Sequence, residues 1–321
     1  MTLRWSEYAS RRAGPPPART SSRRAPGLLA LLAAAALAAA PAGAPAQAQS
    51  AGASESADRP APSPDPATDA PPAGVAAPPA TTESPEDQED ELVRRCEVPD
   101  DAAANDDLLP GFTQALSAAA SPVTVVVLTS LPASGKGDEL GADGFPAQLQ
   151  ARLSSRLAER GVRVNLKVET VGKTRAMAGD LTALIKRRVL PLKPALVIWQ
   201  VGRADARKGN PPYRFNNSLT EGLELLQQQG IDTVLADIQF HPQFEALYRT
   251  DDYRNYVRWI AGKHDLPLLR RYEMINHWAV SDLIDLDSGS DADQRAAYRF
   301  IQECLAHQAT RLIMGAAGLA P

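Results

Sequence analysis

Strand-like and helix-like segments alternate along the chain from residue 123, and this alternation restricts the fold more than any other feature. The expected strands lie at 123–128, 162–168, 195–201, 233–236 and 267–269, and the expected helices at 145–160, 176–188, 219–229, 253–263 and 294–314. The third strand, ALVIWQV, is continuously apolar, as in a parallel strand that is buried on both faces. The pattern predicts one three-layer α/β/α domain of the flavodoxin-like kind with a five-stranded parallel sheet, whose ligand site lies at the carboxyl ends of the strands.

The first part of the chain has the order of an export signal. Arginines up to Arg24 precede an apolar run of 13 Leu and Ala residues at 28–40, and Ala46-Gln47-Ala48 follows. Residues 1–48 are therefore predicted to be a signal peptide that is cleaved after Ala48, and the protein is expected to be periplasmic or secreted. An uncleaved N-terminal anchor is the alternative.

Residues 49–91 are rich in Ala, Pro, Ser, Thr and acids, and Val75 is their only large apolar residue. Such a composition predicts a disordered linker, because it offers too little apolar surface to offset the entropy of ordering. The remaining residues, 92–321, hold 27 acidic and 27 basic side chains and form the predicted domain. This balance does not favour a nucleic-acid partner, and no segment of the mature chain is apolar enough to span a membrane.

The chain has two cysteines, Cys96 and Cys304. In an exported chain an even pair suggests a disulfide, here closing a loop of about 200 residues, and two separate buried thiols are the alternative. Two distant cysteines and four scattered histidines do not make a metal-ligand set, so neither a metal nor another cofactor is expected.

The loop after the first expected strand ends in Ser134-Gly135-Lys136-Gly137, which resembles the end of a phosphate-binding loop. That motif requires a glycine five residues before the Gly-Lys pair and a Ser or Thr after the lysine. Ser130 and Gly137 occupy those two positions. Nucleotide binding is therefore not expected.

Residues 123–278 resemble the SGNH, or GDSL, family of esterases and lipases, and most of all its exported proteobacterial members. The resemblance rests on LVIWQVG (196–202), ADIQFHP (236–242) and LLRRYEMINHW (268–278), with an early Cys96 and a late Cys304-Leu305-Ala306. It implies a serine nucleophile and a histidine base placed by an aspartate three residues earlier. It also implies an oxyanion hole formed by the serine amide, a glycine amide and an asparagine side chain.

The family carries these groups in four sequence blocks. The first two, which hold the nucleophile and the oxyanion glycine, are altered in this chain. The position of the nucleophile falls on Leu131, and Ser130 and Ser134 are only nearby hydroxyls. The turn expected at 171–173 places either Gly172 or Lys173 where the family has its oxyanion glycine.

The last two blocks are altered as well. The third block, Gly-x-Asn-Asp in the family, reads Gly202-Arg203-Ala204-Asp205, so Ala204 replaces the asparagine. The final block, Asp-x-x-His, matches Asp282 and places Asp285 where the base belongs. Leucine offers no nucleophile and alanine no amide donor, so the domain is interpreted as a degenerate member of the family.

The sequence thus predicts an exported binding or scaffolding module of the cell envelope with little or no hydrolase activity. Lys136, Lys173 and Arg203 are cations in strand-end loops, and they are either separate solvated charges or, together, a cleft for an anion. The partner expected for the module is an acylated glycan or a small anionic ligand. Arg270-Arg271 is interpreted as a surface pair.

The alternative is an active esterase or lipase with an altered site. In that case Ser130 or Ser134 would act with His277 or His241 as the base.

Overall fold

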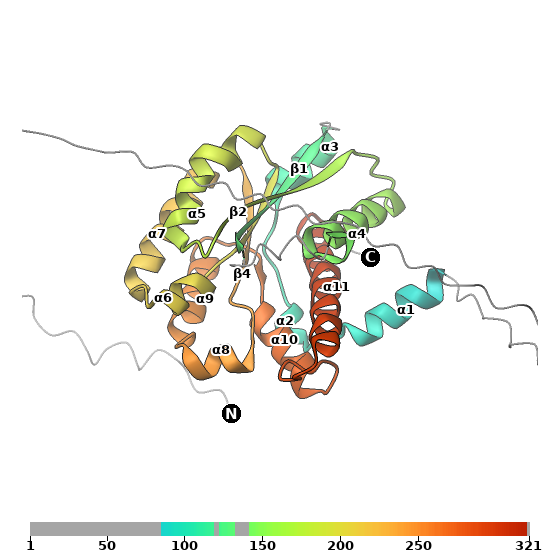
Figure 1. The fold of residues 1–321 in the computed structure, drawn as a ribbon. Helices are drawn as coiled ribbons and strands as arrows, with labels where there is room; N and C mark the ends of the chain where they lie inside the picture. The colour runs from blue at the N-terminus through green and yellow to red at the C-terminus, as the bar shows by residue number, and fades with distance from the viewer. Residues whose placement is uncertain (1–84, 119–121, 132–140, 320–321) are drawn as a thin grey trace, which may run out of the picture. The chain divides into compact units, whose positions relative to one another are not determined.

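The structure is a computed structural model that describes residues 85–118, 122–131 and 141–319 (Figure 1). The signal peptide predicted at 1–48 and most of the predicted linker lie outside these residues, as do Ser134 and Lys136. No helix among the described residues is long and apolar enough to cross a membrane.

A five-stranded parallel sheet forms the centre of the domain, as predicted. Its strands are β1 (Val123–Leu131), β2 (Leu166–Thr174), β3 (Leu196–Gln200), β4 (Asp232–Ala236) and β5 (Leu268–Leu269). Their order is β2-β1-β3-β4-β5, and each neighbouring pair is parallel. This is the flavodoxin-like order, in which the chain reverses its direction of travel across the sheet next to β1.

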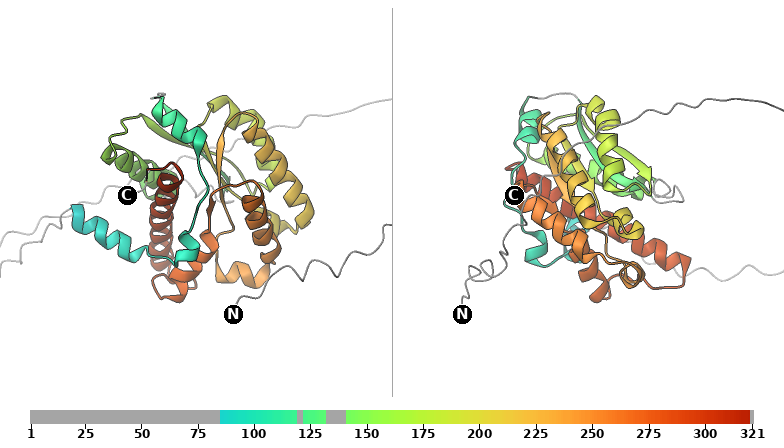
Figure 2. Two further views of the ribbon diagram at one scale, coloured as in Figure 1. Left: turned by 180° about the vertical axis from the view of Figure 1, so that it is seen from behind. Right: turned by 90° about the vertical axis from the view of Figure 1, so that its left-hand side faces the viewer.

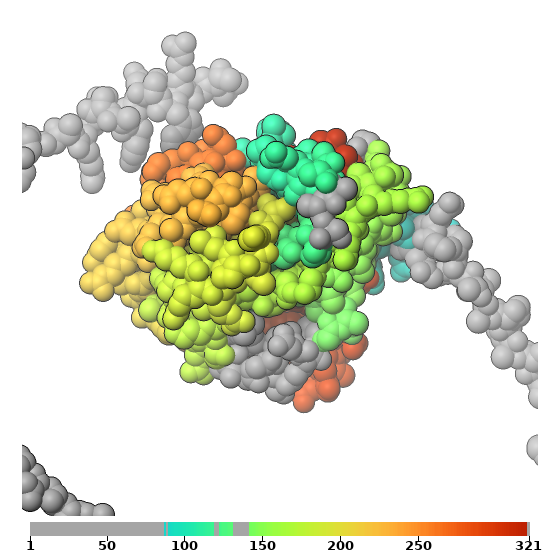
Figure 3. Space-filling model, turned by 90° about the horizontal axis from the view of Figure 1, so that it is seen from above, coloured from blue at the N-terminus to red at the C-terminus, as the bar shows by residue number. Residues whose placement is uncertain are grey.

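Helices cover both faces of the sheet (Figures 1 and 2). One layer consists of α5 (Ala178–Leu184), α7 (Pro212–Gln227) and α9 (Asp251–Lys263). The other contains α4 (Phe145–Glu159) and α11 (Asp291–Ala316), and its core is extended by α1 (Pro85–Arg95), α3 (Pro110–Ser117) and α10 (Arg271–Val280). The short helices are α2 (Asp100–Ala103), α6 (Arg203–Lys208) and α8 (Pro242–Leu247). Seen from above, α3 lies at the surface, in blue-green (Figure 3).

The alternation of β1 divides the interior into two hydrophobic clusters. Val125 and Val127 belong to the cluster under α4 and α11, whereas Val126 and Leu128 belong to the cluster under α5, α7 and α9. Successive side chains of a strand point to opposite faces, so a strand between two helical layers carries apolar side chains toward both of them. The fully buried strand residues therefore confirm the three-layer arrangement.

The second strand differs from its prediction. It was expected at 162–168 but runs from Leu166 to Thr174, and Gly172 and Lys173 pair within it against Thr129 and Ser130 of β1. The expected turn at 171–173 is therefore wrong. As an edge strand, β2 exposes several polar residues, and the apolar residues just before it pack on the core without pairing. The hydrophobic pattern alone therefore predicted this strand too close to the N-terminus.

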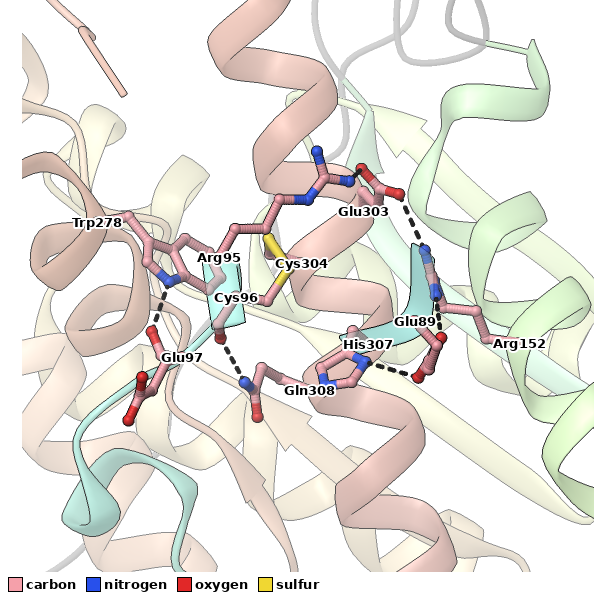
Figure 4. The surroundings of a disulfide bond; sticks show 10 residues. All are labelled: Glu89, Arg95, Cys96, Glu97, Arg152, Trp278, Glu303, Cys304, His307 and Gln308. Carbon is pink, nitrogen blue, oxygen red and sulfur yellow. Dashed lines mark hydrogen bonds and ion pairs between the residues drawn. A yellow bond between two sulfur atoms is a disulfide. The ribbon is translucent and has the colours of Figure 1, made fainter. Parts of the chain in front are cut away.

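The N-terminal helix α1 begins at Pro85, so residues 85–91, which the sequence placed in the linker, are helical. The helix is fixed to the domain by the disulfide Cys96–Cys304, which confirms the predicted pairing (Figure 4). Next to it, Gln308 Nε2 donates to the carbonyl of Cys96 at 2.7 Å, and Trp278 Nε1 donates to the carbonyl of Glu97 at 3.0 Å.

Ion pairs hold the outer side of α1. Glu89 pairs with Arg156 and lies 3.7 Å from Arg152, both on α4. Arg95 pairs with Glu303 of α11, which also accepts from Arg152 at 3.0 Å. These contacts join α1 to both helices of its layer (Figure 4). The domain therefore begins earlier than residue 92.

His307 is buried on α11 beneath α1, with its Nδ1 4.0 Å from Glu89 Oε1. Burial lowers the pKa of His307 to about 4, Glu89 opposes this, and the charges of Arg152, Arg311 and Arg156 add to it. The unfolded chain protonates this histidine near pH 6.5, so between pH 6.5 and 4 it holds more protons than the folded protein. The stability that neutral His307 contributes is therefore lost as the pH falls through this window.

We expect the melting temperature of the wild type, relative to that of His307→Gln, to fall as the pH decreases from 6.5 to 4. Thermal unfolding of both proteins over pH 4 to about 8 measures this difference. The difference between the two proteins also cancels the contribution of Asp237. The pKa of Asp237 is raised to about 6, so this group stabilises the folded protein as the pH falls from 6 to 3.8, which is opposite to the effect of His307. A difference that stays constant with pH would contradict this role of His307.

Candidate functional site

The carboxyl ends of β1, β3 and β4 carry the polar side chains that the sequence placed at the site. At this edge, Thr129 Oγ1 of β1 donates to Gln200 Oε1 of β3 at 2.9 Å. This bond links the ends of the two central strands. Gln200 was not singled out from the sequence, although it is the one polar residue in the otherwise apolar ALVIWQV run.

The position of the nucleophile lies at the end of β1. Leu131 is the last residue of that strand, and Ser130 is partly buried beside Lys173 in the register of β2. Ser134 lies outside the described residues. Among residues 85–118, 122–131 and 141–319, no serine or threonine hydroxyl forms a hydrogen bond with an imidazole nitrogen. A nucleophile–base pair is therefore not assembled in this part of the chain.

Lys173, near the end of β2, forms an ion pair with Asp180. Its Nζ lies 2.7 Å from Asp180 Oδ1, near the start of α5. The hydrogen bond from Lys173 lowers the pKa of Asp180, burial opposes this, and the amide of Met177 adds a second hydrogen bond. Because its charge is compensated by Asp180, Lys173 is not available as a free cation for a ligand.

The third block has a structural role. Ala204 is buried and offers no donor. Asp205 is also buried, and its carboxylate accepts from the backbone N–H of Ala178 at 3.0 Å and from Asn210 Nδ2 at 2.7 Å. Burial raises the pKa of Asp205, and these hydrogen bonds oppose the shift. Asp205 thus joins the end of β3 to the start of α5.

The final block does not form a catalytic pair in the described structure. Asp282 is exposed in a left-handed conformation with φ 57°, just after α10. Asp285 is exposed too, and its Oδ1 accepts from the backbone N–H of Asp287 at 2.9 Å. His277 is partly buried on α10, and within the described residues no hydrogen bond or ion pair joins it to either aspartate.

Two buried residues, Asp237 and Arg271, join the motifs ADIQFHP and LLRRYEMINHW, and this contact was not predicted from the sequence. Arg271, expected at the surface, is buried, and its Nε donates to the carbonyl oxygen of Asp237 at 2.8 Å. Asp237 Oδ1 accepts from the amide of Tyr272 at 3.1 Å. Burial raises the pKa of Asp237 to about 6 and lowers that of Arg271 to about 10. The pair fixes the start of α10 to the end of β4.

Arg203 lies at the end of β3, where Gly202 turns the chain into α6. Gly202 has φ 95°, and a Cβ there would lie 2.7 Å from Ile238 Cγ1, so the turn requires glycine. The block at 202–205, whose Arg203 was expected in a strand-end loop, therefore forms the start of a short helix. The guanidinium of Arg203 stacks over the ring of Phe244 at 4.3 Å.

His241 follows β4 at the same edge of the sheet. It precedes α8, which also carries Phe244. Burial lowers the pKa of His241, the charge of Arg203 lowers it further, and Asp287 raises it. Arg203 and His241 thus follow β3 and β4 at the same edge of the sheet, whereas Lys173 is paired with Asp180 and Lys136 lies outside the described residues. Within the described residues no group of three or more His, Cys, Asp or Glu side chains is arranged to hold a metal.

Comparison with solved structures finds similar folds. A putative lipolytic protein of the G-D-S-L family from Desulfitobacterium hafniense DCB-2 is 19% identical, covering 59% of this chain and 99% of that one with a TM-score of 0.46. The psychrotrophic esterase EstA from Pseudoalteromonas sp. is 16% identical, with 58% and 96% covered and a TM-score of 0.43. The SGNH-hydrolase family esterase AlinE4 is 21% identical, with 59% and 97% covered and a TM-score of 0.41.

No protein with a curated description matches the chain. The model of the non-GDSL lipase-like family, by contrast, matches residues 95–319, which is well over half of the chain and includes every strand of the sheet. The resemblance to SGNH and GDSL hydrolases is thereby confirmed at the level of family and fold, and the chain belongs to the non-GDSL lipase-like family.

Proposed function

We propose that this protein is an exported, catalytically inactive member of its family that binds a ligand at the carboxyl edge of its sheet. In this proposal it acts as a binding or scaffolding module of the cell envelope, and its ligand is a small anion or an acylated glycan. The order of residues in 1–48 and the Cys96–Cys304 disulfide support an oxidising compartment outside the cytoplasm.

The observation that carries the proposal is the absence of a hydroxyl–imidazole pair among the described residues of this edge. The matching positions hold Leu131, Ala204 and Asp285. Leucine offers no nucleophile and alanine no amide donor, and an ionised aspartate beside a second carboxylate is a poor base. In subtilisin, the loss of one triad member costs about four to six orders of magnitude in kcat. Replacement of three groups supports a loss of hydrolysis.

Hydrolysis of short-chain p-nitrophenyl esters by the chain after residue 48 tests the proposal. We expect a rate equal to that of Ser130→Ala and Ser134→Ala, and no gain in Leu131→Ser, because Ala204 and Asp285 would still leave the oxyanion hole and the base incomplete. Turnover by the wild type that either alanine variant abolishes would instead support the active esterase.

A further inference from the structure

Arg203 differs from the other buried or half-buried arginines of the domain. Arg152, Arg254 and Arg258 each lie within ion-pair distance of a glutamate, and Arg271 is bonded to a carbonyl. Among the described residues, by contrast, no carboxylate lies within 4.0 Å of the guanidinium of Arg203 and no acceptor bonds it. Its nitrogen atoms are not among the buried unpartnered atoms, so they reach solvent. Within the described part of the chain, the strand edge thus presents a cation without an ion-pair partner.

Phe244 holds this cation in a defined orientation. The guanidinium lies 4.3 Å above the ring, and Arg207 approaches the same ring at 5.7 Å. Phe244 is itself buried and packs against Tyr248, with 4.7 Å between the ring centroids. A stacked guanidinium keeps its N–H groups in the plane at its edge, where two of them match the two oxygens of a carboxylate, phosphate or sulfate. The second guanidinium adds positive potential at the same place.

His241 adds a hydrogen-bonding group at the start of the helix whose Phe244 stacks under Arg203. It lies three residues before Phe244, at the start of α8. Its lowered pKa leaves the imidazole uncharged at neutral pH, with one nitrogen as donor and the other as acceptor. A group of this kind suits a hydroxyl, which both donates and accepts. Burial lowers the pKa of both groups, whereas Asp287 raises the pKa of His241, and Tyr298 and Glu245 raise the pKa of Arg203.

We propose that Arg203 and His241 form a binding site for a hydroxylated oxyanion. Arg203 takes the carboxylate, phosphate or sulfate group, and His241 takes the adjacent hydroxyl. The inference rests on the proposed function, because it assumes that the carboxyl edge of the sheet binds a ligand without hydrolysing it. The cation directly precedes Ala204, at the block where an active hydrolase has its oxyanion asparagine. A permanent positive charge there favours a ligand that is already an anion over a neutral ester.

Calorimetric titration of the chain after residue 48 with gluconate, inorganic phosphate and sulfate tests this site, with glucose as the uncharged probe. We expect saturable binding of the anions and none of glucose. Arg203→Gln should weaken anion binding about tenfold or more, as expected for the loss of a charged bidentate contact. Arg203→Lys, which keeps the charge but not the fork, should weaken it less. His241→Ala should weaken gluconate more than sulfate.

Arg214→Gln is the matched control, because Arg214 also stacks on an aromatic ring, that of exposed Tyr213 at 5.8 Å. It should bind the anions as the wild type does, and circular dichroism should show every variant folded. Equal binding by the wild type and folded Arg203→Gln, or no binding of any anion, would overturn the site. If the wild type shows no ester turnover, either of these binding results contradicts only the Arg203 site. Ester turnover would instead contradict the proposed function.

Discussion

Replacing Cys96 and Cys304 together by alanine is expected to lower the free energy of unfolding by about 4 to 5 kcal/mol. The disulfide spans 208 residues, so it removes much of the conformational freedom of the unfolded chain. It also fixes α1 against α11, where both cysteines are fully buried. For a domain of this size such a loss lowers the melting temperature by roughly 10 °C or more.

Urea unfolding of the wild type and of the double variant measures this effect. Dithiothreitol should lower the stability of the wild type toward that of the double variant and leave the double variant unchanged. A loss below about 1 kcal/mol would contradict the role of the disulfide, since removal of a native disulfide commonly costs at least 2 kcal/mol.

Asp205→Ala is expected to destabilise the domain by about 3 kcal/mol. The change leaves the buried N–H of Ala178 and the partly buried amide of Asn210 without their acceptor, and an unpaired buried donor costs about 1 to 3 kcal/mol. The matched control is Asp285→Ala, since both aspartates occupy positions of the family's catalytic blocks, yet Asp285 is exposed.

Asp285→Ala should change the stability by less than about 0.5 kcal/mol, the usual range for a surface position. Chemical unfolding of both variants measures the contrast. Equal effects of the two changes would show that Asp205 does not hold the end of β3 to α5 as described.

The parts of the fold that sequence predicted well are those with a strong local pattern. The helix expected at 145–160 is α4, and Leu149, Leu153 and Leu157 are fully buried, as their four-residue spacing indicated. β3 and β4, which lie between two helical layers, also match because they are mainly apolar, apart from Gln200 at the end of β3 and Asp232 and Thr233 at the start of β4. Burial on both faces leaves a clear signal, whereas the edge strand β2 does not.

The site was less predictable because its contacts join distant segments. Arg271 looked like a surface residue, since nothing near it in sequence indicates that Asp237, 34 positions away, receives its hydrogen bonds. The stacking of Arg203 on Phe244 is equally non-local, and α6 and α8 have six residues each, too few for a periodic pattern. Sequence thus identified Arg203 as a cation of the strand ends but not its partners.

Covalent labelling by a fluorophosphonate tests directly whether the family's nucleophile has been lost, and it requires no knowledge of the substrate. Such a reagent phosphonylates a serine that a base has activated, so intact-mass measurement detects an active hydrolase by its adduct. We expect no adduct on the folded chain after residue 48, under conditions in which an active serine esterase is labelled completely. A stoichiometric adduct on Ser130 or Ser134 that disappears when the protein is first unfolded would contradict it.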